Sequence, residues 1–225
     1  MVKVFLSAGH GGIDGGATAN GLKEKEINLN TLLACKEMLE QHGVTVVCSR
    51  VKDEYDPVQD EVKEANVSGA NIAVSFHANA GKGDGFEAYY YLGSTKGYKL
   101  SQLAEKYVKQ LGQNSRGIKS GNHLYFIRKT KMPSVLFESF FLDNNNDKTI
   151  GDTVAEQKAF GVAYAKAILE FYNIKESTNK KSITDIAKEV IQGKYGNGQE
   201  RKNRLTALGY DYATVQSEVN RLLRK

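Results

Sequence analysis

Two histidines and two glutamates, His10, Glu24, His77 and Glu138, are the residues whose types could perform chemistry together. Each follows a short apolar run or opens a helical pattern, so an α/β fold would collect them at one edge of its sheet. Two imidazoles and one carboxylate are a common ligand set for a catalytic zinc ion, which keeps a fourth position open. A second glutamate beside such a site can act as general base. These four residues therefore suggest a zinc-dependent hydrolase.

Each of these residues also has a simpler interpretation. A lone histidine after a strand is more often a hydrogen-bonding group than a metal ligand, and Glu24 could serve only the helix dipole. Glu138 is harder to explain in this way, because a carboxylate among the apolar neighbours of PSVLFESFFLDN is costly unless it is paired, bound to metal or used. Glu26 competes with Glu24, since side chains two residues apart on a helix point about 200° away from each other and only one can face the metal.

The elements that must position these residues follow from the pattern of the chain. Short runs rich in β-branched and aromatic residues alternate with segments of helical period, which predicts an α/β fold with an open, mostly parallel twisted sheet covered by helices. Strands are expected at 2–7, 44–48, 72–76, 86–92, 124–127 and 135–137. Helices are expected at 24–42, 57–68, 96–111 and 153–172. The strand at 44–48 is nearly all apolar, so we expect it near the middle of the sheet.

Charge and composition divide the chain of 225 residues into two parts. Its formal net charge of +5 lies entirely from residue 175 onward. We expect a catalytic domain at 1–174, a linker with almost no apolar residues at 175–181, and a small three-helix bundle at 182–225. Ser182 and Asp211 are the expected helix caps in the bundle. The apolar stripe of its last helix is expected to contain Val215, Val219, Leu222 and Leu223.

Composition also limits the partners and the compartment. A basic appendage on a neutral body suggests a polyanionic partner such as nucleic acid, teichoic acid or an acidic cell wall, although a solvated helix pair would look the same. The amino-terminal apolar run is too short for a signal peptide, and no stretch approaches the roughly 20 apolar residues of a membrane span. We therefore expect synthesis in the cytoplasm and no stable membrane association. Cys35 and Cys48 lack metal-binding spacing and are expected to be reduced thiols.

Four segments, read together, resemble a known family. AGHGG at 8–12, GLKEKEINL at 21–29, SFHAN at 75–79 and RGIKSGNHLYFIRKTKMPSVLFESFFLDN at 116–144 resemble, in order and separation, the zinc-dependent N-acetylmuramoyl-L-alanine amidases of the amidase type 3 family. The resemblance covers essentially all of residues 1–174.

The resemblance implies a role for each of the four residues. His10, Glu24 and His77 would bind one Zn²⁺ ion, and Glu138 would be the catalytic residue. The substrate would be peptidoglycan, cleaved at the amide between the lactyl group of N-acetylmuramic acid and the first L-alanine of the stem peptide. Asn79 and His123 are further candidates for orienting the substrate, with a structural role equally open for each.

The tail carries a second resemblance. GKYGNGQERKNRLTALGYDYATVQSEVNRLL at 193–223 resembles the CW_7 cell-wall-binding repeat of phage lysins, which implies binding to peptidoglycan or muropeptides. Candidate contacts are Tyr195 and Tyr212, which could stack on sugar rings, and Arg201 and Arg204. Without the resemblance, the same tail would suit a helical DNA-binding module; with it, we expect no nucleic-acid partner. Because the chain has one copy, a homo-oligomer formed through this module would restore avidity.

These expectations combine into a two-part lytic enzyme of the phage endolysin type. It would be made in the host cytoplasm without a signal peptide, and would act on a Gram-positive cell wall after release. Two alternatives remain open: a zinc peptidase that cuts the stem peptide or cross-bridge, and a non-catalytic protein that only binds muropeptides.

Overall fold

The computed structural model describes residues 1–175 and 181–224. The chain divides into two compact units, whose described parts are these two ranges. The linker expected at 175–181 falls mostly outside the described residues.

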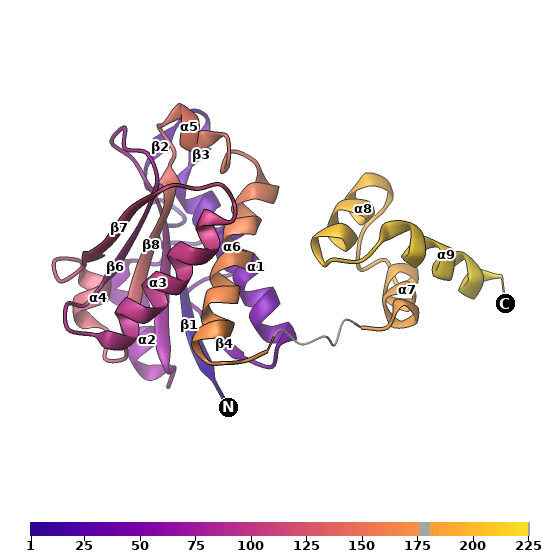
Figure 1. Ribbon diagram of the computed structural model, residues 1–225, viewed down its shortest axis with the longest axis horizontal. Helices are drawn as coiled ribbons and strands as arrows, with labels where there is room; N and C mark the ends of the chain where they lie inside the picture. The colour runs from indigo at the N-terminus through magenta and orange to yellow at the C-terminus, as the bar shows by residue number, and fades with distance from the viewer. Residues whose placement is uncertain (176–180, 225) are drawn as a thin grey trace. The chain divides into compact units, whose positions relative to one another are not determined.

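The first unit is built on a six-stranded sheet with the strand order β4-β1-β5-β8-β6-β7 (Figure 1). The strands are β1 (Lys3–Ala8), β4 (Thr45–Cys48), β5 (Ile72–Asn79), β6 (Phe86–Tyr90), β7 (Ser115–Ser120) and β8 (Ser134–Phe141). Every neighbouring pair is parallel except β6 with β8, which is antiparallel. A small antiparallel ribbon of β2 (Thr18–Ala19) and β3 (Leu22–Lys23) follows β1. The predicted α/β fold with a mostly parallel sheet is confirmed.

Helices cover both faces of this sheet. One face packs against α1 (Glu24–Gln41), α3 (Thr95–Lys109) and α6 (Val154–Phe171). The other packs against α2 (Val58–Val67) and α4 (Tyr125–Lys129), and the short α5 (Asn145–Lys148) lies between β8 and α6 in the chain. Alternate residues of a strand serve opposite faces: Val4 and Leu6 join the first core and Phe5 joins the second. Because both faces are buried, the strands have long apolar runs.

Close helix packing positions α1, the helix that begins at Glu24. A Cβ atom on Gly161 of α6 would lie 2.2 Å from the backbone oxygen of Thr31 in α1, so only glycine permits this approach. Thr153 and Glu156 form a capping box that starts α6. The middle of α1 is thereby packed closely against α6.

Two expected strands are corrected by the structure. The segment at 44–48 forms β4, but β4 is an edge strand with partly exposed residues; its apolar composition reflects packing against α1 rather than a central place. The segment at 124–127 is not a strand, since α4 begins at Tyr125. Short apolar runs do not distinguish the two states, and here Phe126 and Ile127 reach the second core from one helical turn. The edge strand β7 was missed because SRGIKS has a single large apolar residue.

The second unit contains α7 (Ile183–Ile191), α8 (Gly198–Ala207) and α9 (Tyr212–Leu223), as the sequence predicts. The side chains of Ser182 and Asp211 accept hydrogen bonds from the backbones of Asp185 and Thr214, so both expected caps are confirmed. Its core consists of Ile186, Ala187, Val190, Leu205, Tyr210, Val215 and Val219. Leu223 is 65% exposed and therefore does not belong to the expected stripe. Within the two described ranges, no helix is long and apolar enough to cross a membrane.

Candidate metal centre and active site

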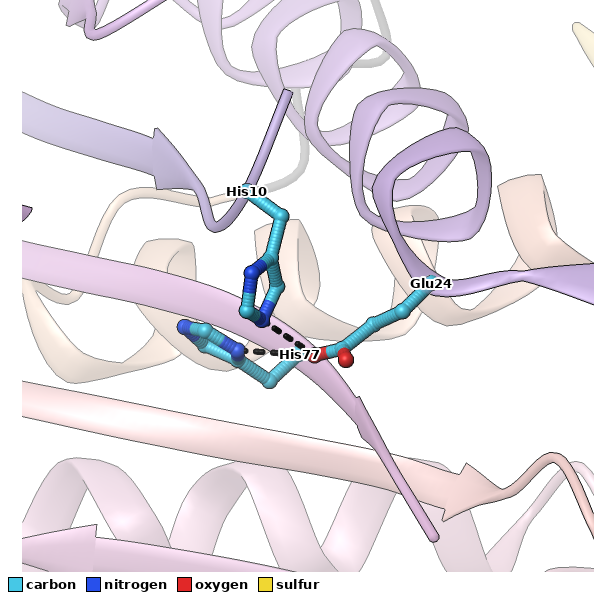
Figure 2. Close-up of side chains that lie close together, drawn as sticks. All are labelled: His10, Glu24 and His77. Carbon is cyan, nitrogen blue, oxygen red and sulfur yellow. Dashed lines mark hydrogen bonds and ion pairs between the residues drawn. The ribbon is translucent and has the colours of Figure 1, made fainter. Parts of the chain in front are cut away.

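Three of the four residues singled out by the sequence form one cluster. His10 lies in the loop after β1, Glu24 is the first residue of α1, and His77 lies within β5 rather than after it. One potential ligand atom from each lies within 4.8 Å of the others. Figure 2 shows both imidazoles directed at the same carboxylate oxygen: Glu24 Oε1 is 2.9 Å from His77 Nδ1 and 3.2 Å from His10 Nε2.

The structure also separates Glu24 from its competitor Glu26. Glu24 is 6% exposed and faces the histidines, whereas the Glu26 side chain is 58% exposed and pairs with Lys23. Glu24 also accepts a hydrogen bond from the backbone of Ala17. Of the two glutamates at the start of α1, Glu24 therefore points into the cluster and Glu26 points to solvent.

Asp14 orients His10 and was not singled out by the sequence. Its Oδ2 lies 2.9 Å from His10 Nδ1, which leaves Nε2 directed at Glu24. Carboxylate partners of this kind fix the ring of a metal-binding histidine. Two backbone hydrogen bonds between Gly11 and Asp14 close the loop, and His10 itself has a φ of 65°, a left-handed value that a non-glycine residue adopts only when its surroundings hold it. The sequence signal that could have identified Asp14 is its position four residues after His10.

Arg50 is hydrogen-bonded to the same loop, and the sequence did not identify it either. Its side chain is 2% exposed, and its guanidinium donates to backbone oxygens on both sides of the site: Ala8, Gly9, Lys25 and Lys52. Asn28 of α1 donates a further hydrogen bond to the oxygen of Gly9. The loop that carries His10 and the helix start that carries Glu24 are thus joined through one buried cation.

Glu138 lies beside the cluster on the neighbouring strand. It is the register partner of His77 in the parallel pair of β5 and β8. Its Oε2 is buried and has no hydrogen-bond partner among the described residues. Burial raises the pKa of Glu138 to about 7. A carboxyl group with an unused buried oxygen and a pKa near neutrality is suited to accepting and returning a proton.

The electrostatics of the cluster reflect the shared carboxylate. The hydrogen bond with Glu24 raises the pKa of His10 to about 9. Burial opposes ionisation of Glu24, but hydrogen bonds with His10 and His77 outweigh it and hold the pKa of that carboxyl far below its usual value. The pKa of His77 is raised because Glu24 overcomes the effect of burial on the imidazole. Glu24 and the two imidazoles therefore stabilise one another's charged forms.

The donor set fits a zinc ion. Two imidazole nitrogens and one carboxylate oxygen are a known catalytic set, and tetrahedral bonds near 2.0–2.1 Å place ligand atoms about 3.3 Å apart. The separations of 2.9 and 3.2 Å around Glu24 Oε1 are close to that value. Glu138, whose Oε2 has no hydrogen-bond partner in the part of the chain that the structure describes, is the register partner of His77 on the adjacent strand. The residues present therefore fit a single zinc ion with an open position.

The two candidates for orienting the substrate, Asn79 and His123, both lie near Glu87, one in direct contact with it and one through Tyr89. The Asn79 side chain donates to Glu87 at 3.4 Å, and the exposed ring of His123 contacts the edge of Tyr89, whose hydroxyl donates to Glu87. Neither candidate belongs to the metal cluster, and both border the same face of the sheet. Their proposed contact with substrate stays a prediction.

The four candidates in the second unit differ in availability. Tyr195 and Tyr212 are partly buried against the core of the bundle, and the Tyr195 hydroxyl donates to Glu189. Arg201 is tied to the backbone oxygen of Gly196 and to two side chains. Arg204 is exposed, pairs with Glu200 across one turn of α8, and donates to the backbone oxygen of Lys194. Of the four, Arg204 is the most accessible to a ligand.

Comparison with known proteins matches the chain to two families. Residues 4–170 match the family described as N-acetylmuramoyl-L-alanine amidase, and residues 184–223 match the CW_7 repeat. The chain is 37% identical over 182 residues to the N-acetylmuramoyl-L-alanine amidase CwlM of Bacillus licheniformis, covering 79% of this chain and 71% of that protein. It is 36% identical over 186 residues to a protein named endolysin from Bacillus phage SPP1, covering 78% and 68%.

A solved structure gives the same result for the fold. The catalytic domain of CwlV, an N-acetylmuramoyl-L-alanine amidase from Bacillus (Paenibacillus) polymyxa var. colistinus, superposes with a TM-score of 0.72 at 32% identity. The match covers 78% of this chain and 100% of that domain.

Proposed function

We propose, because this chain belongs to the N-acetylmuramoyl-L-alanine amidase family, that His10, Glu24 and His77 hold a zinc ion and that Glu138 is the catalytic base. The chain is a peptidoglycan amidase, which hydrolyses the amide between the lactyl group of N-acetylmuramic acid and L-alanine. One observation carries the assignment of roles: the three ligand atoms lie together, and on the neighbouring strand Glu138 has a buried oxygen with no hydrogen-bond partner in the described ranges 1–175 and 181–224.

The chemistry divides between the ion and the protein. A bound zinc ion would polarise the scissile carbonyl and make a water acidic enough to attack near neutral pH. Glu138 Oε2 accepts the proton of the attacking water and then delivers it to the amine nitrogen that leaves with L-alanine. Asp14 keeps His10 in its ring orientation, and Arg50 holds the loop and the helix start in register. The protein thereby supplies proton transfer and a preorganised ligand set.

Replacing Glu138 by glutamine tests the role of the base. The amide keeps the size of the side chain and cannot accept the proton, so we expect turnover on purified peptidoglycan to fall by about 10² to 10⁴. Zinc content, measured by metal analysis, should stay at the wild-type level. Glu26→Gln is the matched control, because Glu26 is exposed at the start of the same helix and pairs with the exposed Lys23. Near-normal turnover of the Glu138 variant would remove it from the mechanism.

The same digests distinguish the amidase from a zinc peptidase. An amidase frees the amino group of L-alanine, whereas a peptidase frees amino groups further along the stem or in the cross-bridge. Amino-terminal analysis of the released peptides therefore decides between them. Lysis that stops when a chelator is added, and returns with zinc, would set aside a protein that only binds muropeptides.

The second unit is proposed to attach the enzyme to a Gram-positive wall, as in a phage endolysin that acts after release. The match to the CW_7 repeat supports wall binding. The similarity to the endolysin of Bacillus phage SPP1 supports a role as a phage endolysin. We expect Arg204→Gln to weaken sedimentation of the full chain with purified walls, and Arg224→Gln, an exposed change in the same unit, to leave it unaltered. Binding to nucleic acid would instead weaken steeply with salt.

Self-association through this module is a separate proposal. A single repeat gives modest affinity, and pairing two chains would raise the effective concentration of the second binding event. Light scattering at working concentration measures the mass directly, and a monomer would contradict the proposal.

A further inference from the structure

A buried glutamate next to the catalytic residue gathers two cations that the mechanism does not use. Glu87 on β6 is 3% exposed. Its Oε1 accepts from Arg116 Nε at 2.6 Å and from Lys119 Nζ at 2.5 Å, both on β7. Its Oε2 accepts from the hydroxyl of Tyr89 at 2.6 Å. The side chains of Arg116 and Lys119 are 43% and 37% exposed, so each cation is anchored at one side and open to solvent at the other.

The strand order places this cluster on the face that carries the active site. Glu87 is the register partner of Glu138 in the antiparallel pair of β6 and β8, and Glu138 is the partner of His77 in the pair of β5 and β8. Directly opposed residues lie on the same face, with Cβ atoms about 4.5–5.5 Å apart. The row across the sheet therefore runs from the metal cluster through Glu138 and Glu87 to the cations of β7.

The charge of the cluster is not balanced internally. Within the group of Glu87, Arg116 and Lys119, one carboxylate faces two cations, and Asp147 is a further carboxylate that acts on Arg116 from outside the group. Arg116 uses its Nε for the hydrogen bond to Glu87. The terminal nitrogens of a guanidinium can together donate to both oxygens of a carboxylate. The guanidinium also lies 5.2 Å from the ring centroid of Phe141, which holds its plane in place. Arg116 and Lys119 are thus preorganised donors for an anion.

We propose that Arg116 and Lys119 bind a free carboxylate of the stem peptide, beyond the amide that is cleaved. This inference rests on the amidase function proposed above. Strands are about 4.8 Å apart, so β7 lies about 10 Å from β8, and an extended peptide advances about 3.3–3.6 Å per residue. A carboxylate within about three residues of the scissile amide spans this separation. The cluster would therefore select stem peptides by their charge, without taking part in bond cleavage.

The test compares two soluble N-acetylmuramoyl tripeptides that differ only in having all carboxyl groups free or all converted to amides. We expect the wild type to have a kcat/KM about tenfold higher on the free-carboxyl substrate. A partly exposed, charge-assisted pair of hydrogen bonds between the enzyme and the carboxylate would contribute about this much. Arg116→Gln and Lys119→Gln should each reduce that preference, while kcat/KM on the amidated substrate stays within about twofold. Arg116→Lys should restore part of the preference, because the charge returns without the fork.

Controls separate binding from folding and from the function itself. Each single variant leaves Glu87 one cation, so the melting temperature should change little. Lys96→Gln removes an exposed lysine at the start of α3, beside the chain segments that lead into β1 and β5, and should leave both substrates unaffected. Equal loss on both substrates, or a wild type without preference, would overturn the proposed role of the two cations. A wild type that cleaves neither substrate nor purified walls would instead contradict the amidase function.

Discussion

Replacing Gly9 by alanine is the sharpest test of how the metal cluster is built. The ring of His77 lies directly against Gly9: an added Cβ would be 2.2 Å from Cε1 and 2.3 Å from Nε2 of that imidazole. Carbon atoms in contact are about 3.5–4.0 Å apart, so the ring would have to retreat by more than about 1 Å. The backbone of Gly9 lies outside the left-handed region, and alanine therefore adds no backbone strain. The perturbation is confined to the position of one proposed ligand.

A displacement of this size is large for a metal site. Zinc ligands keep their distances within about 0.2 Å, and a misplacement of about 1 Å at an active site can cost about 10² in rate. We therefore expect Gly9→Ala to lower zinc affinity by at least about tenfold and kcat/KM by about 100-fold. Zinc affinity is measured by competition with a chromogenic chelator, and kcat/KM by the release of amino groups from soluble muropeptides.

Gly15 provides the matched control in the same loop. A Cβ there would meet no atom within 4 Å, and its φ is not positive, so Gly15→Ala should keep zinc affinity and turnover. The reasoning is refuted if Gly9→Ala binds zinc and turns over substrate like wild type. Equal losses in both variants would show that the loop, rather than the contact with His77, is sensitive.

Three further predictions concern stability and the division of labour. Arg50→Ala removes the four hydrogen bonds from the guanidinium to the backbone and should lower the free energy of unfolding by about 2–4 kcal/mol in urea titrations. The exposed Lys52→Ala should change it by no more than about 0.5 kcal/mol, and equal effects of the two variants would contradict the role of Arg50. Gly161→Ala gains about 1 kcal/mol in helix propensity but collides with the backbone of α1, so net destabilisation of about 1–2 kcal/mol is expected in the same titration, and a more stable variant would disprove it. Removing residues 175–225 should spare hydrolysis of soluble fragments and impair lysis of whole cells, and parallel loss of both activities would argue against separate roles.

The sequence determined the features that depend on local chemistry. The alternation of strand and helix patterns predicts the α/β class, because each residue in these segments is placed by its near neighbours. The caps Ser182 and Asp211 were identified in the same way, since a cap and the amide it accepts from lie within one turn. His10, Glu24, His77 and Glu138 were recognised because each stands where a helix pattern begins or near a predicted strand end.

The tertiary structure decided which polar groups meet. Asp14 is four residues from His10, so the spacing of the sequence could have identified it. Arg50 instead contacts the backbone of residues 25 to 42 positions away. Glu87 pairs with cations that are 29 and 32 positions further along the chain. The place of β4 at the edge and the helical state of α4 were likewise settled by packing rather than by composition. Buried charges must find partners, and those partners are chosen by how the strands are ordered in space, which local spacing does not encode.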